Sequence, residues 1–235
     1  MIENRKPLVY IISAPSGSGK STLANEILKL VPNLVFSISY TTRALRGSEQ
    51  NGKQYHFVTM EEFERMVRDS EFLEHANVHG NCYGTSRRFL REAGQSGQDL
   101  LLDIDVQGAA QVKENLTDAI SIFVLPPDRQ TLEWRLRNRS ENREDEIQRR
   151  LQDARREIES YDKYDYVLIN DQLEKSIERL RAIVLSERLR REQRELSEQE
   201  NAIVARAERL RLANLKEKVQ PILASFRTSA SPALP

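Results

Sequence analysis

Apolar residues in this chain gather in short continuous runs, and each run is followed by a stretch with apolar residues at helical spacing. The runs cover residues 8–13, 100–104, 120–125 and 166–169. Continuous apolar runs of this length are typical of strands that are buried on both faces of a parallel sheet. Because strands and helices alternate along the chain, we expect an α/β fold with a mostly parallel sheet flanked by helices.

Residues 35–97 have a different pattern. Residues 36–40 and 55–59 alternate between apolar and polar side chains, as half-buried strands do. Thr59 and Glu62 have the spacing of a helix capping box. This segment is therefore predicted to be a small mixed β/α insertion in the α/β core, where a substrate-binding lobe could lie.

The C-terminal part of the chain carries most of the charge. Of the 72 charged side chains, 44 lie in residues 128–235. We expect residues 188–220 to form a charged helical extension, which is either solvated or in contact with a second copy of the chain. Residues 221–235 contain three prolines and predict a disordered tail. Truncation after Glu195 should then leave activity nearly intact.

The overall composition excludes several classes of protein. The chain has 235 residues, with 36 basic and 36 acidic side chains and 39% hydrophobic residues, which argues against a disordered chain and against a protein that coats nucleic acid. Cys82 is the only cysteine, so no disulfide can form within the chain. No apolar run approaches the roughly 18 residues of a membrane helix. We therefore expect a cytoplasmic protein with no membrane or nucleic-acid partner.

A glycine-rich loop joins the first predicted strand to the first predicted helix. The loop consists of Ala14, Pro15, Ser16, Gly17, Ser18, Gly19, Lys20, Ser21 and Thr22. Glycines let backbone N–H groups approach an anion, and the start of the following helix adds its positive end. Lys20 would then reach the β- and γ-phosphates of a nucleoside triphosphate, and Ser21 would hold Mg²⁺. The strict P-loop pattern begins with glycine, where this chain has Ala14.

Two carboxylates stand at the end of the strand predicted at residues 100–104. Asp103 and Asp105 would lie at the carboxyl edge of the sheet, where ligands bind in open α/β folds. Either one could assist Mg²⁺ binding. The alternative is that both are solvated acids at a strand end.

The predicted insertion contains four side chains that are candidates for binding a phosphate group. Arg43, Arg46, Tyr55 and Tyr83 lie within it. Planar guanidinium groups and phenolic hydroxyls suit the oxygens of a phosphate monoester. The alternative is that these side chains belong to an ordinary polar surface.

Six segments carry a resemblance to a known family. They read SAPSGSGKST, FSISYTTR, RGSEQNGKQYHFV, EFLEHANVHGNCYGTS, LLLDIDVQGAA and DYVLIND, in that order, over residues 7–187. The chain resembles the guanylate kinase family, bacterial type. The resemblance implies a P-loop nucleoside monophosphate kinase fold. Its domain at 6–187 would comprise a core (6–34 and 98–187), a GMP-binding insertion (about 35–97) and a helical lid (about 135–150).

The resemblance also implies an activity, a cofactor and a set of site residues. The γ-phosphoryl group of ATP would be transferred to GMP, giving ADP and GDP, with Mg²⁺ as cofactor and dGMP as a further expected substrate. The step would belong to purine nucleotide metabolism and GMP recycling, and it would be essential for GTP and dGTP supply. ATP would be bound by residues 14–22, Arg135 and Arg139. GMP would be bound by Ser39, Arg43, Arg46, Glu49, Tyr55, Glu74, Tyr83, Thr85, Asp103 and Arg150. Catalysis would involve Lys20, Arg43, Arg139 and Arg150, and the metal would lie near Ser21 and Asp103.

Within that set, Ser39, Glu74 and Thr85 would read the guanine base. Guanine offers N1–H and N2–H₂ donors to the Glu74 carboxylate and an O6 acceptor to the Thr85 hydroxyl. Adenine presents the opposite pattern and would leave Glu74 unpaired, which is costly for a buried carboxylate.

Two departures from the family pattern concern loops. Leu45 replaces a proline that usually precedes the second phosphate-binding arginine, so the loop of Arg46 is expected to be less rigid. In the lid, Asn138, Arg139 and Ser140 stand where the family commonly has an Arg-Gly pair after a small residue. These changes affect the expected timing of the lid rather than the reaction.

Other readings are weaker. A guanylate-kinase-like interaction module is one alternative, but such modules tend to lose the phosphate loop or its lysine. A kinase for another nucleoside monophosphate is the second. The spacing of His75 and His79 is a poor metal signal, Cys82 has no evident base to make it a nucleophile, and Trp134 is expected to pack its helix against the sheet. A homodimer through the C-terminal helix is left open.

Overall fold

The computed structural model describes residues 5–78, 80–139 and 143–227. The chain forms two compact units, which are described separately below. Unit 1 comprises residues 1–11 and 31–120, and unit 2 comprises residues 12–30 and 121–235. Strand β1 (Val9–Ser13) passes from unit 1 into unit 2.

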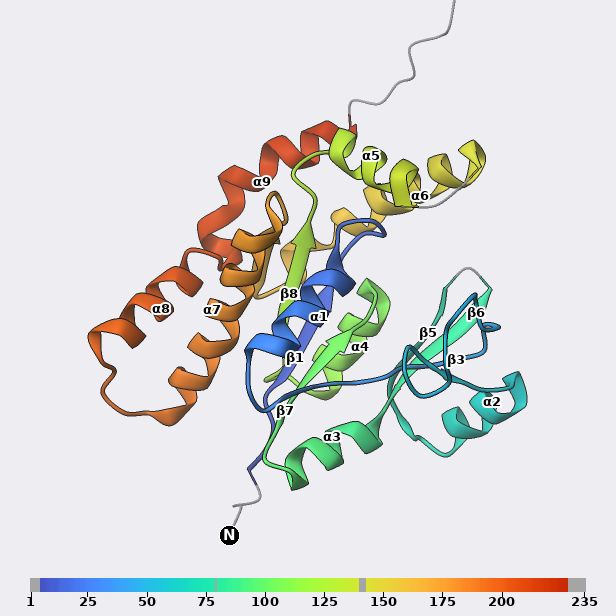
Figure 1. Cartoon of the computed structure of the whole chain (residues 1–235), viewed down its shortest axis with the longest axis horizontal. Helices are drawn as coiled ribbons and strands as arrows, with labels where there is room; N and C mark the ends of the chain where they lie inside the picture. Colours follow the sequence, from blue (N-terminus) through green and yellow to red (C-terminus); the bar gives the residue numbers. More distant parts are fainter. Residues whose placement is uncertain (1–4, 79, 140–142, 228–235) are drawn as a thin grey trace, which may run out of the picture. The chain divides into compact units, whose positions relative to one another are not determined.

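Unit 1 combines short strands with three helices (Figure 1). The strands are β2 (Leu34–Phe36), β3 (Tyr40–Thr41), β4 (His56–Phe57), β5 (Phe72–Val78), β6 (Asn81–Ser86) and β7 (Asp99–Asp103). The helices are α2 (Met60–Arg68), α3 (Arg87–Gln95) and α4 (Val106–Asn115).

Unit 2 is mainly helical. It contains α1 (Lys20–Leu30), β8 (Ile120–Leu125, of which Ile120 belongs to unit 1), α5 (Arg129–Arg139), α6 (Glu144–Ile158), a 3₁₀ turn (Tyr161–Lys163), β9 (Tyr166–Ile169), α7 (Leu173–Glu192), α8 (Glu198–Glu208) and α9 (Leu212–Arg227). None of the helices that the structure describes is long and apolar enough to cross a membrane.

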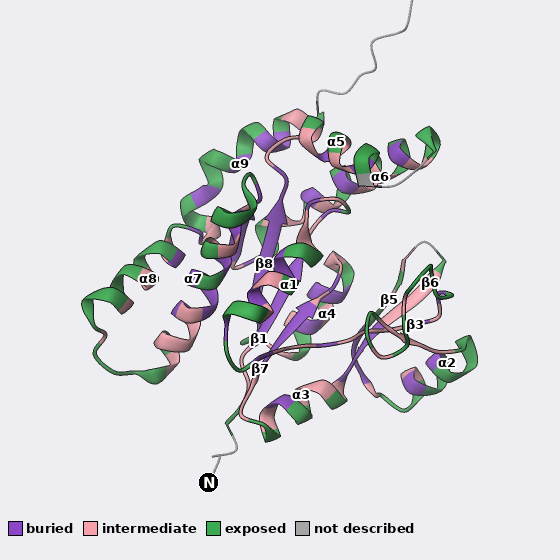
Figure 2. Ribbon diagram, viewed as in Figure 1, coloured by how far each residue is buried: buried purple, intermediate pink, exposed green. Residues whose placement is uncertain are grey.

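The strands form two sheets. Five of them hydrogen-bond in the order β2-β7-β1-β8-β9, and β2 pairs with β7 and β8 with β9 in parallel. The four continuous apolar runs become β1, β7, β8 and β9, and Figure 2 shows these strands almost entirely buried. The prediction of a mostly parallel sheet flanked by helices is confirmed.

The second sheet lies within the predicted insertion. Its order is β4-β3-β6-β5, with β3 parallel to β4 and antiparallel to β6. Helix α2 begins after Thr59, whose side chain accepts the N–H of Glu62. Phe63 and Met66 of this helix pack on Phe72 of β5 and form a small apolar cluster. The insertion is thus a mixed sheet that has its own core.

The C-terminal extension differs from its prediction. Helix α7 ends at Glu192, Gln193 adopts a left-handed conformation (φ 49°), and α8 runs back along α7 (Figure 1). Residues 221–227 continue α9 and are not a disordered tail, so the prediction is wrong for them; residues 228–235 lie outside the described residues. The prediction treated Pro221 as a helix breaker. In the structure, the buried apolar face of α9 outweighs the helix-breaking tendency of one proline.

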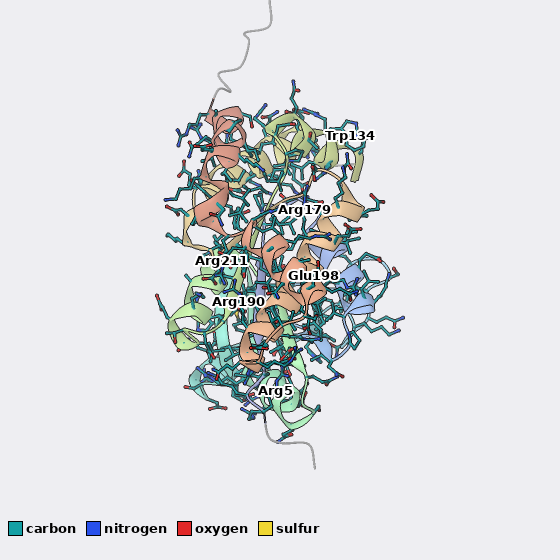
Figure 3. All side chains as sticks on the ribbon, turned by 90° about the vertical axis from the view of Figure 1, so that its left-hand side faces the viewer. Arg5, Trp134, Arg179, Arg190, Glu198 and Arg211 are labelled. Atoms are coloured by element: carbon teal, nitrogen blue, oxygen red, sulfur yellow. The ribbon has the colours of Figure 1, made fainter. Side chains whose placement is uncertain are left out.

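Trp134 on α5 also differs from its prediction. The side chain is 65% exposed, and it is labelled in Figure 3. Leu132 and Leu136, on another face of the same helix, are buried. The prediction that Trp134 packs its helix against the sheet is therefore wrong, and the buried leucines of α5 lie beside Gly17 of the glycine-rich loop.

Candidate functional site

The glycine-rich loop lies in unit 2, between β1 and α1. Gly17 and Gly19 have φ angles of 90° and 89°, which L side chains rarely adopt. A Cβ atom at Gly17 would lie 2.9 Å from the Leu136 side chain, and one at Gly19 would lie 2.5 Å from Nδ2 of Asn170. Both positions therefore require glycine. Since α1 begins at Lys20, the loop leads directly into a helix N-terminus, which favours an anion.

Asn170 and Arg135 hold this loop from the side. Nδ2 of Asn170 donates to the Ser18 carbonyl at 2.7 Å, and Arg135 donates to the Asn170 carbonyl at 2.9 Å and to that of Ser18 at 3.4 Å. Burial lowers the pKa of Arg135, and Asp128 opposes that shift. The structure thus brings Arg135, a predicted ATP-binding residue, to the loop.

Asn170 is a residue of this site that sequence reasoning missed. It is 5% exposed and follows β9, in the last of the six family segments. Its Oδ1 and the hydroxyl of Ser18 are buried without a hydrogen-bond partner among the described residues. Most buried polar atoms in proteins are paired, so two such atoms beside an anion-binding loop indicate a functional site. The position of Asn170 at a strand end was the available signal.

The candidate metal-binding groups supply oxygen atoms. Ser21 stands in the first turn of α1, and Asp103 is the last residue of β7. Asp105 caps α4, where its Oδ1 accepts the N–H of Gly108 at 2.8 Å. Each of these side chains is a type of oxygen donor that Mg²⁺ uses, one or two at a time, together with substrate phosphates.

In unit 1, Arg43 is the centre of a polar and aromatic group. Its side chain is buried, donates to Glu49 at 2.8 Å, and lies 5.3 Å from the Tyr55 ring and 5.6 Å from the Phe57 ring. The hydrogen bond to Glu49 is the main reason that the pKa of Arg43 is raised, and it likewise lowers the pKa of Glu49. Arg46 is exposed, and its backbone N–H donates to Glu49 at 2.8 Å.

Two tyrosines complete this group. The rings of Tyr55 and Tyr83 meet edge to face at 5.8 Å. Burial raises the pKa of Tyr55, and the negative charge of Asp103 adds to the shift. The structure therefore brings together Arg43, Glu49, Tyr55 and Tyr83, while the Arg46 side chain points into solvent. A buried guanidinium beside phenolic hydroxyls can bind an anionic oxygen.

The candidate base-reading residues form a buried pair. Glu74 and Thr85 face each other across β5 and β6, next to an irregularity in the register of β5. The Thr85 hydroxyl donates to Oε1 of Glu74 at 2.6 Å. Thr85 is 0% exposed and Glu74 is 4% exposed. Ser39 is half-buried, and its carbonyl accepts the N–H of His56 at 2.9 Å.

Helices α5 and α6 carry the remaining predicted arginines. Arg150 of α6 donates to Glu146 at 2.6 Å. Arg137 of α5 donates to Glu133 at 2.7 Å and to Glu144 at 2.6 Å, and this interaction lowers the pKa of Glu144 to about 2. Arg139 is the last residue of α5, but its side chain and Ser140 lie outside what the structure describes.

The discounted residues show no sign of a further site. His75 is exposed, whereas His79 lies outside the described residues. Within the described ranges, no group of three or more His, Cys, Asp or Glu residues could hold a metal ion. Cys82 is a half-buried free thiol.

The parallel sheet and the glycine-rich loop that leads through Lys20 into α1 define a P-loop phosphotransferase fold. Comparison with known families makes the class specific. The family model for guanylate kinase matches residues 5–187, and the chain belongs to the guanylate kinase family.

Relatives support this assignment. A guanylate kinase from Koribacter versatilis is 56% identical over 227 residues, which are 95% of this chain and 97% of that protein. One from Geobacter metallireducens is 50% identical over 186 residues, 79% of this chain and 92% of that protein. The crystal structure of guanylate kinase from Anaplasma phagocytophilum has a TM-score of 0.62 and 37% identity, and covers 77% of this chain and 86% of that one.

Proposed function

We propose that this protein transfers the γ-phosphoryl group of ATP to GMP, giving ADP and GDP, and thereby serves purine nucleotide metabolism, GMP recycling and the supply of GTP and dGTP. The match of the family model to residues 5–187 carries the proposal. The intact loop, with Gly17, Gly19 and Lys20, supports it against a reading as an interaction module that has lost catalysis.

In the proposed reaction, an oxygen of the GMP phosphate attacks the γ-phosphorus of ATP. A new P–O bond forms while the bond to the β,γ-bridging oxygen breaks, and ADP leaves with that oxygen. Such a transfer needs alignment and charge stabilisation more than covalent help from the protein. The backbone N–H groups of residues 14–22 bind the β-phosphate, and Lys20 neutralises charge that develops on the β- and γ-phosphates.

The acceptor phosphate is held by Arg43, Arg46, Tyr55 and Tyr83. Arg43 donates to Glu49 at 2.8 Å, so the Glu49 carboxylate accepts from a guanidinium N–H group that the phosphate would use. We infer that GMP binding exchanges this carboxylate for a phosphate oxygen, and that Glu49 keeps Arg43 oriented until then. The exposed Arg46 then turns toward the phosphate.

The guanine base is read by Glu74, Thr85 and Ser39. The buried Glu74 carboxylate accepts the N1–H and N2–H₂ donors of guanine, and the Thr85 hydroxyl, which donates to Glu74 at 2.6 Å, turns to O6. Adenine would leave the buried carboxylate facing an acceptor, which predicts strong rejection of AMP.

Mg²⁺ is the proposed cofactor, bound by Ser21 and Asp103 together with phosphate oxygens. When bound, it would shield the phosphate charges that oppose the approach of the attacking oxygen. Arg135, Arg139 and Arg150 of the proposed lid add positive charge to the same groups. Of these, Arg135 donates to the Ser18 carbonyl at 3.4 Å, which supports its role at the ATP loop.

A coupled assay of ADP release tests the proposal. ATP and Mg²⁺ are offered with GMP, dGMP, AMP, UMP or dTMP, and turnover is expected with GMP and dGMP only. Lys20→Ala should abolish turnover. Glu74→Gln should raise the KM for GMP by at least about 100-fold, because a charged hydrogen bond is lost and a donor faces a donor. No turnover with GMP would overturn the proposal, and an unchanged KM in Glu74→Gln would overturn the base-reading role alone.

Two further proposals concern the state of the protein in the cell. A cytoplasmic location rests on the single cysteine of the chain. A homodimer through the C-terminal helix has less support, because Leu210 and Leu215 of the extension are buried within their own chain. Analytical ultracentrifugation tests the dimer, and a monomer at micromolar concentration would exclude it.

A further inference from the structure

The C-terminal extension lies outside the part of the chain that defines the family. The family model ends at residue 187, and the Geobacter relative matches 79% of this chain although the match covers 92% of its own length. The Koribacter relative, in contrast, matches 95% of this chain. Family membership therefore assigns no role to α8 and α9, and their contacts must show what they do.

One end of the extension is fixed to the edge of the large sheet. Residues 210–212 run beside β9: the N–H of Val167 donates to the Leu210 carbonyl at 2.9 Å, and the N–H of Leu212 donates to the Asp165 carbonyl at 3.2 Å. Arg211, labelled in Figure 3, lies 4.5 Å over the Tyr166 ring. Helix α9 thus starts from a rigid, hydrogen-bonded position.

The other end of the extension reaches helix α5. Leu215, Val219, Ile222, Leu223 and Phe226 form the buried face of α9, which contacts α5 and α6 as well as β9 (Figure 1). The hydroxyl of Ser225 accepts the backbone N–H of Arg129 at 3.1 Å and donates to the Ile222 carbonyl at 2.6 Å. Arg129 is the first residue of α5, where helix N–H groups have no partner within the helix.

The start of α5 is connected to α6 by ion pairs. Arg129 lies 3.3 Å from Glu133, Glu133 lies 2.7 Å from Arg137, and Arg137 lies 2.6 Å from Glu144 in the first turn of α6. Asp128 accepts the N–H of Thr131 at 2.6 Å and fixes the same turn of α5. Because Arg129 begins α5 and α5 also packs against α6, a displacement at Arg129 would act on the two helices that carry Arg135 and Arg150.

We propose that the C-terminal extension anchors the lid, and that Ser225 is a positioning residue which sets the start of α5 for phosphoryl transfer. The inference rests on the proposed function, because it assigns the arginines of α5 and α6 to the transferred phosphate. Ser225 touches neither nucleotide in this scheme. It acts through the backbone of Arg129, and the sheet edge at residues 210–212 supplies the fixed support.

The test compares two serine-to-alanine variants of the full chain. Ser225→Ala removes the acceptor of the Arg129 N–H. Ser197→Ala is the matched control, because Ser197 caps α8 in the same extension and its loss also destabilises a helix without touching α5. Ser225→Thr restores the hydroxyl. The steady-state kcat and KM for GMP and the amide exchange of the first turn of α5 are measured for each.

Ser225→Ala should lower kcat about five-fold, which is the effect expected from the loss of one hydrogen bond. The KM for GMP should stay within about two-fold of that of the unmodified protein. The α5 amides of Ser225→Ala should exchange faster. Ser225→Thr should recover at least half of the lost kcat, and Ser197→Ala should keep the kcat of the unmodified protein.

The inference is overturned if Ser225→Ala keeps full kcat, if Ser225→Thr fails to recover it, or if Ser197→Ala loses as much. An unmodified protein without GMP turnover would contradict the proposed function instead. Amide exchange would then still decide whether Ser225 holds α5, because that readout needs no activity.

Discussion

At the scale of single residues, the space around Glu74 depends on a glycine in another element. Gly108 lies in α4, and a Cβ atom at this position would lie 2.9 Å from Cδ of Glu74 and closer still to its Oε2. Glu74 is buried and bonded to Thr85, so it has little freedom to retreat. Gly108 therefore protects the position of the carboxylate.

We expect Gly108→Ala to raise the KM for GMP by about 10-fold or more, because the displaced carboxylate loses part of its hydrogen bonding with guanine. Gly94→Ala is the matched control. Gly94 is also helical, and its Cβ would meet Pro7 at an ordinary 3.4 Å. Equal KM values for Gly108→Ala and the unmodified protein would show that Glu74 can shift without loss.

His56 gives a prediction on pH. Its ring stacks on Tyr40 at 4.6 Å and on Phe89 at 5.8 Å, and burial, assisted by the positive charge of Arg88, lowers its pKa below the usual value of about 6.5. The folded state therefore binds fewer protons at this site than the unfolded state. The contribution of neutral His56 to the stability of the fold is complete above pH 6.5, and it is lost as the pH falls through the lowered pKa.

His56→Phe keeps an aromatic ring in the stack but cannot titrate. Between pH 7.5 and 5.5, the Tm of the unmodified protein should fall more than the Tm of His56→Phe, as measured by calorimetry. His75→Phe serves as a control at an exposed position. Parallel curves for the unmodified protein and His56→Phe would contradict the assignment.

The same scale shows what sequence could and could not predict about the site. Gly17, Gly19 and Lys20 were found because a loop motif is local in sequence. Arg43, Tyr55 and Tyr83 were found by residue type together with the family resemblance, and the structure does bring them together. Asn170 was missed because its contact with Ser18 spans 152 positions of sequence, and no local pattern reports such a contact.

At the scale of elements, prediction succeeded where the apolar residues form continuous runs. The continuous apolar runs became β1, β7, β8 and β9 because strands buried on both faces need such sequences. It failed for residues 221–227 of α9, where the apolar residues follow Pro221 and were assigned to a disordered tail. Those apolar residues gain their stability from α5, α6 and β9, which the local pattern does not contain.

The packing of the extension predicts that truncation lowers the stability of the fold. A chain that ends at Glu195 would lose the partner of the Val167 N–H and the five buried apolar side chains of α9. We expect its Tm to fall by roughly 10 °C or more, since each buried apolar side chain contributes about 1.5–3 kcal/mol at most. A chain that ends at Arg227 keeps α9 and is the control. Equal Tm values for the two chains would contradict the packed state of α9.

At the scale of the whole molecule, the balanced charge has an internal division. The phosphate loop and the lid helices belong to unit 2, and the candidate GMP residues other than Arg150 belong to unit 1. Many charged side chains in residues 128–235 form ion pairs, such as Arg137 with Glu133 along α5 and Arg194 with Glu200 at the start of α8. Pairs of this kind are exposed and contribute little stability each. Net charge therefore says little about the sites, which depend on a few buried groups such as Arg43 and Glu74.

The exposed position of Trp134 has one practical consequence. It is the only tryptophan of the chain, and it stands on α5, one residue before Arg135. Indole emission is sensitive to solvent, and the tryptophan fluorescence of this protein comes from a single place in its proposed lid. Stopped-flow mixing with nucleotide would follow that helix in real time without any attached dye.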